Sequence, residues 1–130
     1  MKDSILKIKS KQFALRIIKL YKYMCSEKQE FVMSKQMLRS GTSIGANIAE
    51  AFYAESDMDF VHKLSISQKE AGETIYWLEL LHESDYMSDV EFFSINTDAE
   101  ELIKLLTSSI KTVKAKLKNK DKVSVFSDKI

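Results

Sequence analysis

The chain has 130 residues, of which 45% are hydrophobic and 30% charged, and its formal net charge is +1. This composition is ordinary for one soluble domain and excludes an intrinsically disordered chain. No apolar run reaches the ~20 residues needed to span a bilayer. A single Cys25 excludes an internal disulfide framework, so we expect a cytoplasmic protein with no membrane role.

The absence of proline and the small number of glycines predict long helices joined by short connections. A 4-3 spacing of apolar residues predicts a first helix over residues 4–26. A second helix is predicted over residues 30–54. A third, over residues 57–86, carries an unbroken 4-3 repeat from Phe60 to Leu81.

Ser88 and Glu91 form a capping box, which predicts a fourth helix over residues 88–118. The remaining residues, 119–130, are polar and are predicted to form a C-terminal tail. The fold class is therefore all-α, with one domain over residues 1–118. Short connections favour an antiparallel, up-down-up-down four-helix bundle.

Charge is segregated along the chain. Residues 1–29 and residues 102–130 each hold eight basic residues against two acidic ones, whereas residues 57–101 hold two against twelve. In the predicted bundle the first and fourth helices are neighbours, so their basic ends are expected to meet. Such a cluster attracts phosphate without reading base sequence. The candidate nucleic-acid-binding residues are Lys7, Lys9, Lys11, Lys114, Lys116 and Lys118.

Gly41, Gly45 and Ala49 recur every four residues and would line one ridge of the second helix. Glycine costs ~1 kcal/mol inside a helix relative to alanine, so we expect close helix packing at this ridge to offset that cost. The alternative is that Gly41 ends one helix and begins another.

The third helix carries apolar residues on more than one face. At 100° per residue, Ile66, Trp77 and Leu80 point away from the predicted core, and Tyr76 extends their stripe. We expect these four residues to form an oligomer interface. The alternative is that long charged side chains cover them.

No catalytic or metal-binding constellation is expected. Asp59-x-x-His62 and Glu79-x-x-His82 resemble half-motifs of a di-metal site, but both lie on one helix, roughly 30 Å apart, and cannot share an ion. Phosphate-cradling loops and nucleophile elbows are also absent from the sequence. We therefore expect no enzyme activity, no metal and no cofactor.

Two segments carry a family resemblance. The first reads R-S-x-x-S-I-x-x-N-I-A-E-A from Arg39 to Ala51, and the second reads F-x-x-K-L-S-I-x-x-K-E-A-x-E-T-x-Y-W-L-x-L-L from Phe60 to Leu81. Together they resemble the 23S rRNA intervening-sequence proteins, also known as four-helix-bundle proteins and labelled ribosomal proteins. The resemblance implies an antiparallel four-helix bundle assembled into a homopentameric ring, with no established activity. The motif's polar residues are Arg39, Ser40, Ser43, Asn47 and Glu50.

Asn47 and Glu50 are expected to form a buried hydrogen-bonding pair, with a ligand site inside the ring as the alternative. Arg39 is expected to pair with an acidic residue across an interface. A more distant resemblance links the chain to the accessory proteins of diversity-generating retroelements, whose five-membered helical rings are thought to engage a reverse transcriptase and its template RNA.

These observations predict a non-enzymatic, oligomeric protein that associates weakly with RNA. A homo-oligomer repeats each modest basic patch, so that RNA could bind by avidity. The alternative is a scaffold ring that binds an unidentified protein partner and has no nucleic-acid role. Salt-dependent RNA binding distinguishes the two.

Overall fold

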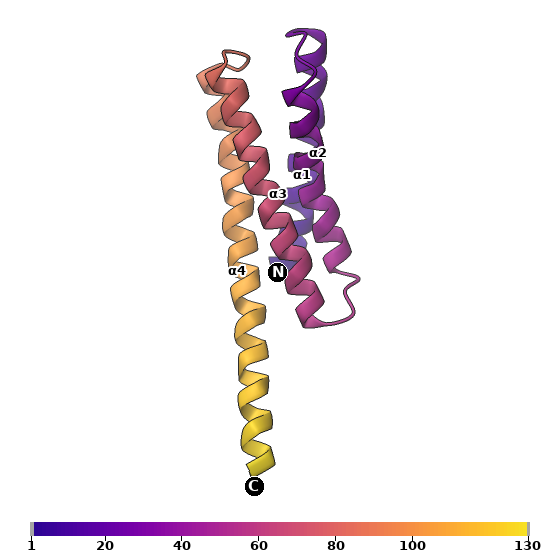
Figure 1. Ribbon diagram of the computed structural model, residues 1–130, viewed down its shortest axis with the longest axis vertical. Helices are drawn as coiled ribbons and strands as arrows, with labels where there is room; N and C mark the ends of the chain where they lie inside the picture. The colour runs from indigo at the N-terminus through magenta and orange to yellow at the C-terminus, as the bar shows by residue number, and fades with distance from the viewer. Residues whose placement is uncertain (1, 130) are drawn as a thin grey trace.

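The computed structural model describes the backbone of residues 2–129 and the side chains of residues 5–120. This part of the chain contains four helices and no strand, which confirms the all-α prediction (Figure 1). The helices are α1 (Lys2–Ser26), α2 (Met33–Ala51), α3 (Asp57–Glu83) and α4 (Asp89–Lys129).

The four helices pack as a closed cycle in which α1 contacts α2, α2 contacts α3, α3 contacts α4 and α4 contacts α1. The α1 and α3 helices are therefore diagonally opposite. The Ser67 hydroxyl donates to the Ile44 carbonyl, and the Thr74 hydroxyl donates to the Ser40 hydroxyl. Residue numbers thus fall along α2 as they rise along α3, so these two helices run in opposite directions.

The core lies along the centre of the bundle and is built from the predicted apolar stripes. From the predicted stripe of α1, Leu6, Ser10, Phe13, Ile17 and Met24 are buried, whereas Leu20 is half-buried. The 4-3 repeat of α3 is buried from Leu64 onward, whereas Phe60 at its start is half-buried. The stripe of α4 contributes Phe92, Ile95, Ala99, Leu102, Leu106 and Ile110.

The second helix begins at Met33, later than residue 30, because Glu30 caps the helix from outside it. Its carboxylate accepts backbone N–H bonds from Val32 and Met33 at 3.0 and 2.9 Å, and from Ser34 at 2.7 Å. The first N–H groups of a helix have no partner within the helix, and this buried carboxylate supplies one.

The third helix ends at Glu83, short of residue 86. Asp85 adopts a φ of 71°, in the left-handed region that interrupts a helix, and the Tyr86 N–H returns to the Leu81 carbonyl at 2.9 Å. The predicted capping box follows: the Glu91 N–H donates to the Ser88 hydroxyl, and the Ser88 N–H donates to the Glu91 carboxylate.

The fourth helix continues to Lys129, so the prediction that it gives way to a tail at residue 119 is wrong. Residues 119–129 contain neither glycine nor proline, and polarity alone does not end a helix. Figure 1 shows the end of α4, in yellow, projecting well beyond the other three helices.

The glycine ridge faces α1, and α2 passes through Gly41 without a break. A Cβ atom at Gly41 would lie 2.9 Å from Cγ1 and Cγ2 of Ile17, which is closer than carbon atoms pack. At Gly45 the nearest atom would be the Ser10 carbonyl oxygen, at 3.4 Å. Ala49 is exposed, so of the three ridge positions Gly41 makes the tightest contact with a side chain of α1.

Gly72 provides the opposite case in the middle of α3, where an added Cβ would meet no atom within 4 Å. Replacing Gly72 with alanine is expected to stabilise the protein by up to ~1 kcal/mol, because alanine loses less backbone entropy in a helix. Urea denaturation measures this gain. An unchanged or lower urea midpoint would show that a contact on the exposed face of α3 requires a residue without a side chain at position 72.

Candidate interaction surfaces

The end of α4 carries a dense run of positive charge. Residues 111–120 contain no acidic residue, and all of their lysine side chains are exposed. One of them, Lys120, has its Nζ 3.9 Å from Asp57, the first residue of α3. We call this run the basic segment; its lysines are Lys111, Lys114, Lys116, Lys118 and Lys120.

The lysines of α1 were predicted to form one patch with those of the fourth helix. In the structure they lie apart from the basic segment. The Lys9 ammonium lies 2.7 Å from the Glu101 carboxylate, and this hydrogen bond raises the pKa of Lys9. Lys114 lies thirteen positions after Glu101, or ~20 Å further along the helix axis. Lys9 is only ~10 Å from the start of α1, so the basic segment extends past that helix.

The remaining lysines of the predicted patch face the other side of α1. The Lys7 ammonium lies over the Phe52 ring, 4.2 Å from its centre. Together with Lys11 it lines a groove between α1 and α2, above Gly45. The structure thus places the predicted nucleic-acid-binding lysines in three locations, of which only the basic segment concentrates charge.

Arg39 pairs with acidic residues of its own chain. Its guanidinium donates to Glu73 at 2.5 Å and lies 3.5 Å from a carboxylate oxygen of Glu70. The Trp77 indole N–H donates to the same Glu73 oxygen at 3.0 Å. The Trp77 and Arg39 hydrogen bonds hold the pKa of Glu73 below its usual value. The two family-like segments therefore meet at the seam between α2 and α3.

The other polar residues of the motif serve the same helix pair. Ser40 is buried and accepts the hydrogen bond from Thr74, while Ser43 donates to the Arg39 carbonyl at 2.6 Å. Asn47 donates to the Ser43 carbonyl at 2.9 Å, but Glu50 is exposed. The expected buried Asn47–Glu50 pair is wrong, because the amide of Asn47 is satisfied within its own helix.

The predicted interface stripe of α3 is only partly outward. Tyr76 is 53% exposed, whereas Ile66 and Leu80 are half-buried. Trp77 is also half-buried and packs against the core at its edge, so its expected outward position is wrong. Its bond to Glu73 turns the indole toward the α2–α3 seam.

A second outward apolar stripe, which was not predicted, lies on α1. Ile8 and Leu15 are 56% and 58% exposed, and Ile5 and Ile18 flank them. The signal was present in the sequence, since Ile8 and Leu15 are seven residues apart and therefore share a face opposite the buried Leu6–Ile17 stripe.

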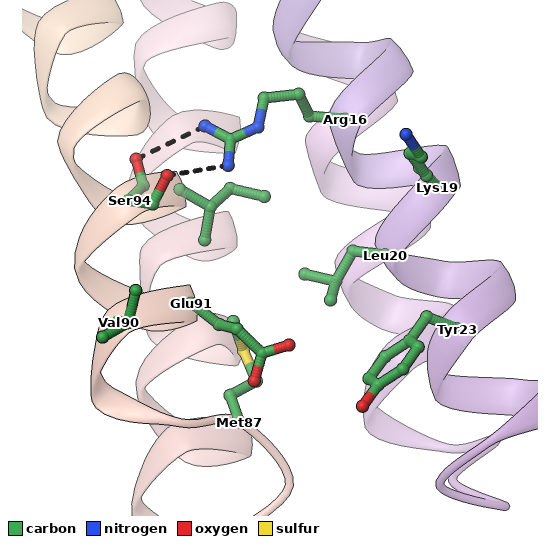
Figure 2. A pocket seen from close by; sticks show the side chains of 9 residues that line it. Arg16, Lys19, Leu20, Tyr23, Met87, Val90, Glu91 and Ser94 are labelled. Carbon is green, nitrogen blue, oxygen red and sulfur yellow. Dashed lines mark hydrogen bonds between the residues drawn. The ribbon is translucent and has the colours of Figure 1, made fainter.

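An apolar groove of about 550 Å³ separates α1 from the beginning of α4. Figure 2 shows Leu20 and Tyr23 of α1 on one side and Met87 with Val90 on the other. Arg16 closes one end of the groove by donating to Ser94. The groove has a mostly apolar lining and a polar rim, so it is suited to binding an apolar side chain. Val90, at its edge, is 80% exposed.

Among the side chains of residues 5–120, no three of the metal-binding types lie close enough to hold an ion. His82 stacks on Phe92 with ring centres 4.3 Å apart, and its Nε2 lies 2.6 Å from Asp89. Within the described helices, none has both the length and the apolarity to cross a membrane.

Comparison with known proteins assigns the chain to a family. Residues 2–108 match the 23S rRNA-intervening sequence protein family, and the chain belongs to that family. It is similar to the crystal structure of a protein of unknown function from the S23 ribosomal protein family of Bacteroides thetaiotaomicron. The two chains are 58% identical and superpose with a TM-score of 0.85, over 85% of this chain and 99% of the other. No curated protein matches the chain significantly.

Proposed function

We propose that this chain is a cytoplasmic, non-enzymatic accessory protein that self-associates, as a homopentameric ring of antiparallel bundles, and contacts RNA through the basic segment of α4. The basic segment is the observation that carries the proposal. Its lysines are all exposed, and they precede the end of α4 that projects beyond the other three helices, so a phosphate backbone can approach them from solvent. A ring repeats this segment in every copy, which raises the avidity of a weak site.

Lysine contacts phosphate as a point charge and reads little base sequence. Binding is therefore expected to be nearly independent of RNA sequence, micromolar in affinity and strongly weakened by salt. Lys114 and Lys118 lie one helical turn apart on one face of the segment, so a single strand can contact both.

Replacing Lys114 and Lys118 with glutamate is expected to weaken RNA binding at least about tenfold at low salt. The slope of log affinity against log salt should also fall by about 0.7 for each lost phosphate contact on a single strand. Electrophoretic mobility shifts at several salt concentrations measure both quantities.

The matched control is the double change Lys28→Glu and Lys35→Glu, which alters the net charge equally at the opposite end of the bundle. It should leave binding close to that of the wild type. Equal losses in the two variants would show that net charge, and not the basic segment, governs binding. No shift of any RNA at low salt would refute the nucleic-acid role.

A second candidate function is a scaffold that binds a protein partner without RNA. The observation that favours it is the apolar groove between α1 and α4, with Val90 and Phe93 exposed beside it. Under this alternative the wild type does not bind RNA, and Val90→Glu abolishes recovery of the partner from the native host while the basic-segment variant retains it.

A further inference from the structure

The two outward apolar stripes lie on opposite sides of the molecule. Ile5, Ile8, Leu15 and Ile18 form the α1 stripe, and Ile66, Tyr76 and Leu80 form the α3 stripe. Because α1 and α3 are diagonal in the bundle, neither stripe can cover the other within one chain. Apolar residues gathered on one helix face are typical of a protein–protein contact.

The charges beside the two stripes have opposite sign. From residue 5 to residue 26, α1 contains six basic residues and no acidic one. The α3 helix contains six acidic residues against two lysines. On the outward side, Lys11 and Lys22 flank the α1 stripe. Lys69 is exposed near Ile66, but from residue 70 to residue 83 α3 contains no lysine or arginine, and Glu79 and Glu83 are exposed near Tyr76 and Leu80. The two faces are therefore complementary in charge as well as apolar.

We propose that the α1 stripe of one copy docks on the α3 stripe of the next copy. The contact is heterologous, because different surfaces of the two copies meet, and heterologous contacts produce closed rings when the rotation between copies closes. This inference rests on the self-association in the proposed function and names the surface that α3 contacts. A symmetric α3–α3 contact would instead bring two acidic helices together and leave the α1 stripe exposed.

The test uses two variants, each of which damages one of the two surfaces. Leu15→Glu places a negative charge in the α1 stripe, where it would face the acidic α3 of the next copy. Leu80→Glu places the same charge in the α3 stripe. Each variant alone is expected to be monomeric by light scattering, because every contact in its assembly would contain the altered surface.

Mixing the two variants is the decisive step. An intact α3 from the Leu15→Glu chain can then dock on an intact α1 from the Leu80→Glu chain, while both outer surfaces remain damaged. The mixture should form one-to-one dimers of twice the 15.0 kDa chain mass and nothing larger. Circular dichroism confirms that each variant remains folded. Because Leu80 is half-buried, Tyr76→Glu serves as a second α3 variant at a position that is 53% exposed.

Val90→Glu is the control, since Val90 is an exposed apolar residue outside both stripes, and its assembly should match the wild type. Wild-type mass for Leu15→Glu, or a mixture that stays monomeric, would overturn the α1–α3 contact while leaving self-association intact. A wild type that is monomeric at tens of micromolar would overturn self-association itself, and the inference with it. RNA binding by the basic segment would be tested separately.

Discussion

Replacing Gly41 with leucine is expected to destabilise the bundle by about 3 kcal/mol, near the upper end of overpacking costs. A Cβ atom at this position would lie 2.9 Å from two carbons of Ile17 and 3.2 Å from a third. Ile17 is completely buried and is stiff at its branched Cβ, so it has little freedom to move aside. The gain of ~1 kcal/mol from removing a helical glycine does not offset this clash. Urea denaturation measures the loss.

A double-mutant cycle identifies the cause of this loss. If Ile17 is the obstacle, Gly41→Ala should cost less in an Ile17→Ala background than in the wild type, because the smaller partner leaves room for the added methyl group. Gly72→Ala serves as the matched control, since it changes the same residue types on an open helix surface. Equal effects of Gly41→Ala in both backgrounds would show that close packing against Ile17 does not explain the glycine.

Replacing Glu30 with glutamine is expected to destabilise the protein by about 1–3 kcal/mol at neutral pH, because one oxygen of the side chain becomes an NH₂ group. A glutamine keeps a single acceptor oxygen, so either the Ser34 N–H or the Val32 and Met33 N–H groups lose their partner. Glu27→Gln, at an exposed position three residues earlier, is the matched control and should change stability little.

The contribution of Glu30 also depends on pH. Burial disfavours the charged carboxylate, but the hydrogen bonds from the N–H groups of Met33, Ser34 and Val32 outweigh it and lower the pKa of Glu30 below 4.5. A lowered folded-state pKa means that the folded protein binds fewer protons than the unfolded chain. The stability that the Glu30 carboxylate contributes is therefore present above pH 4.5 and is lost as the pH falls below it. The stability gap between wild type and Glu30→Gln should therefore narrow under acid conditions. A gap that stays constant would show that the carboxylate does not cap α2.

Much of the fold was predictable because four amphipathic stripes repeat at helical spacing and almost nothing in the sequence interrupts them. The buried residues of α1 and of α3 from Leu64 onward are those of the predicted stripes, and the Ser88–Glu91 capping box lies where its spacing predicts. Helix ends were less predictable, since they depend on contacts such as the Glu30 carboxylate. The end of α4 does not follow from the polarity of residues 119–129, because polar residues without glycine or proline can continue a helix.

The interaction surfaces were predicted less well, because their geometry depends on which helices are neighbours and on how they are aligned. The run of lysines in α4 is visible in the sequence. The pairing of Lys9 with Glu101, however, shows that the N-terminal end of α1 does not reach the basic segment. Similarly, helical spacing alone pointed Trp77 outward, whereas its hydrogen bond to Glu73 draws it toward the α2–α3 seam.

The all-α class, the number of helices and most of the core-facing residues follow from the amino-acid sequence alone. The motifs that begin at Arg39 and at Phe60 likewise indicate the family. Local periodicity and short motifs encode these properties, and they need no knowledge of neighbours. Three features depend on how the helices pack in three dimensions. Arg39 joins α2 to α3, Gly41 and not Ala49 packs against Ile17 of α1, and the α1 and α3 stripes lie on opposite sides of the molecule. Each of these depends on the alignment of helices far apart in the chain, which side-chain packing sets and which no local pattern records.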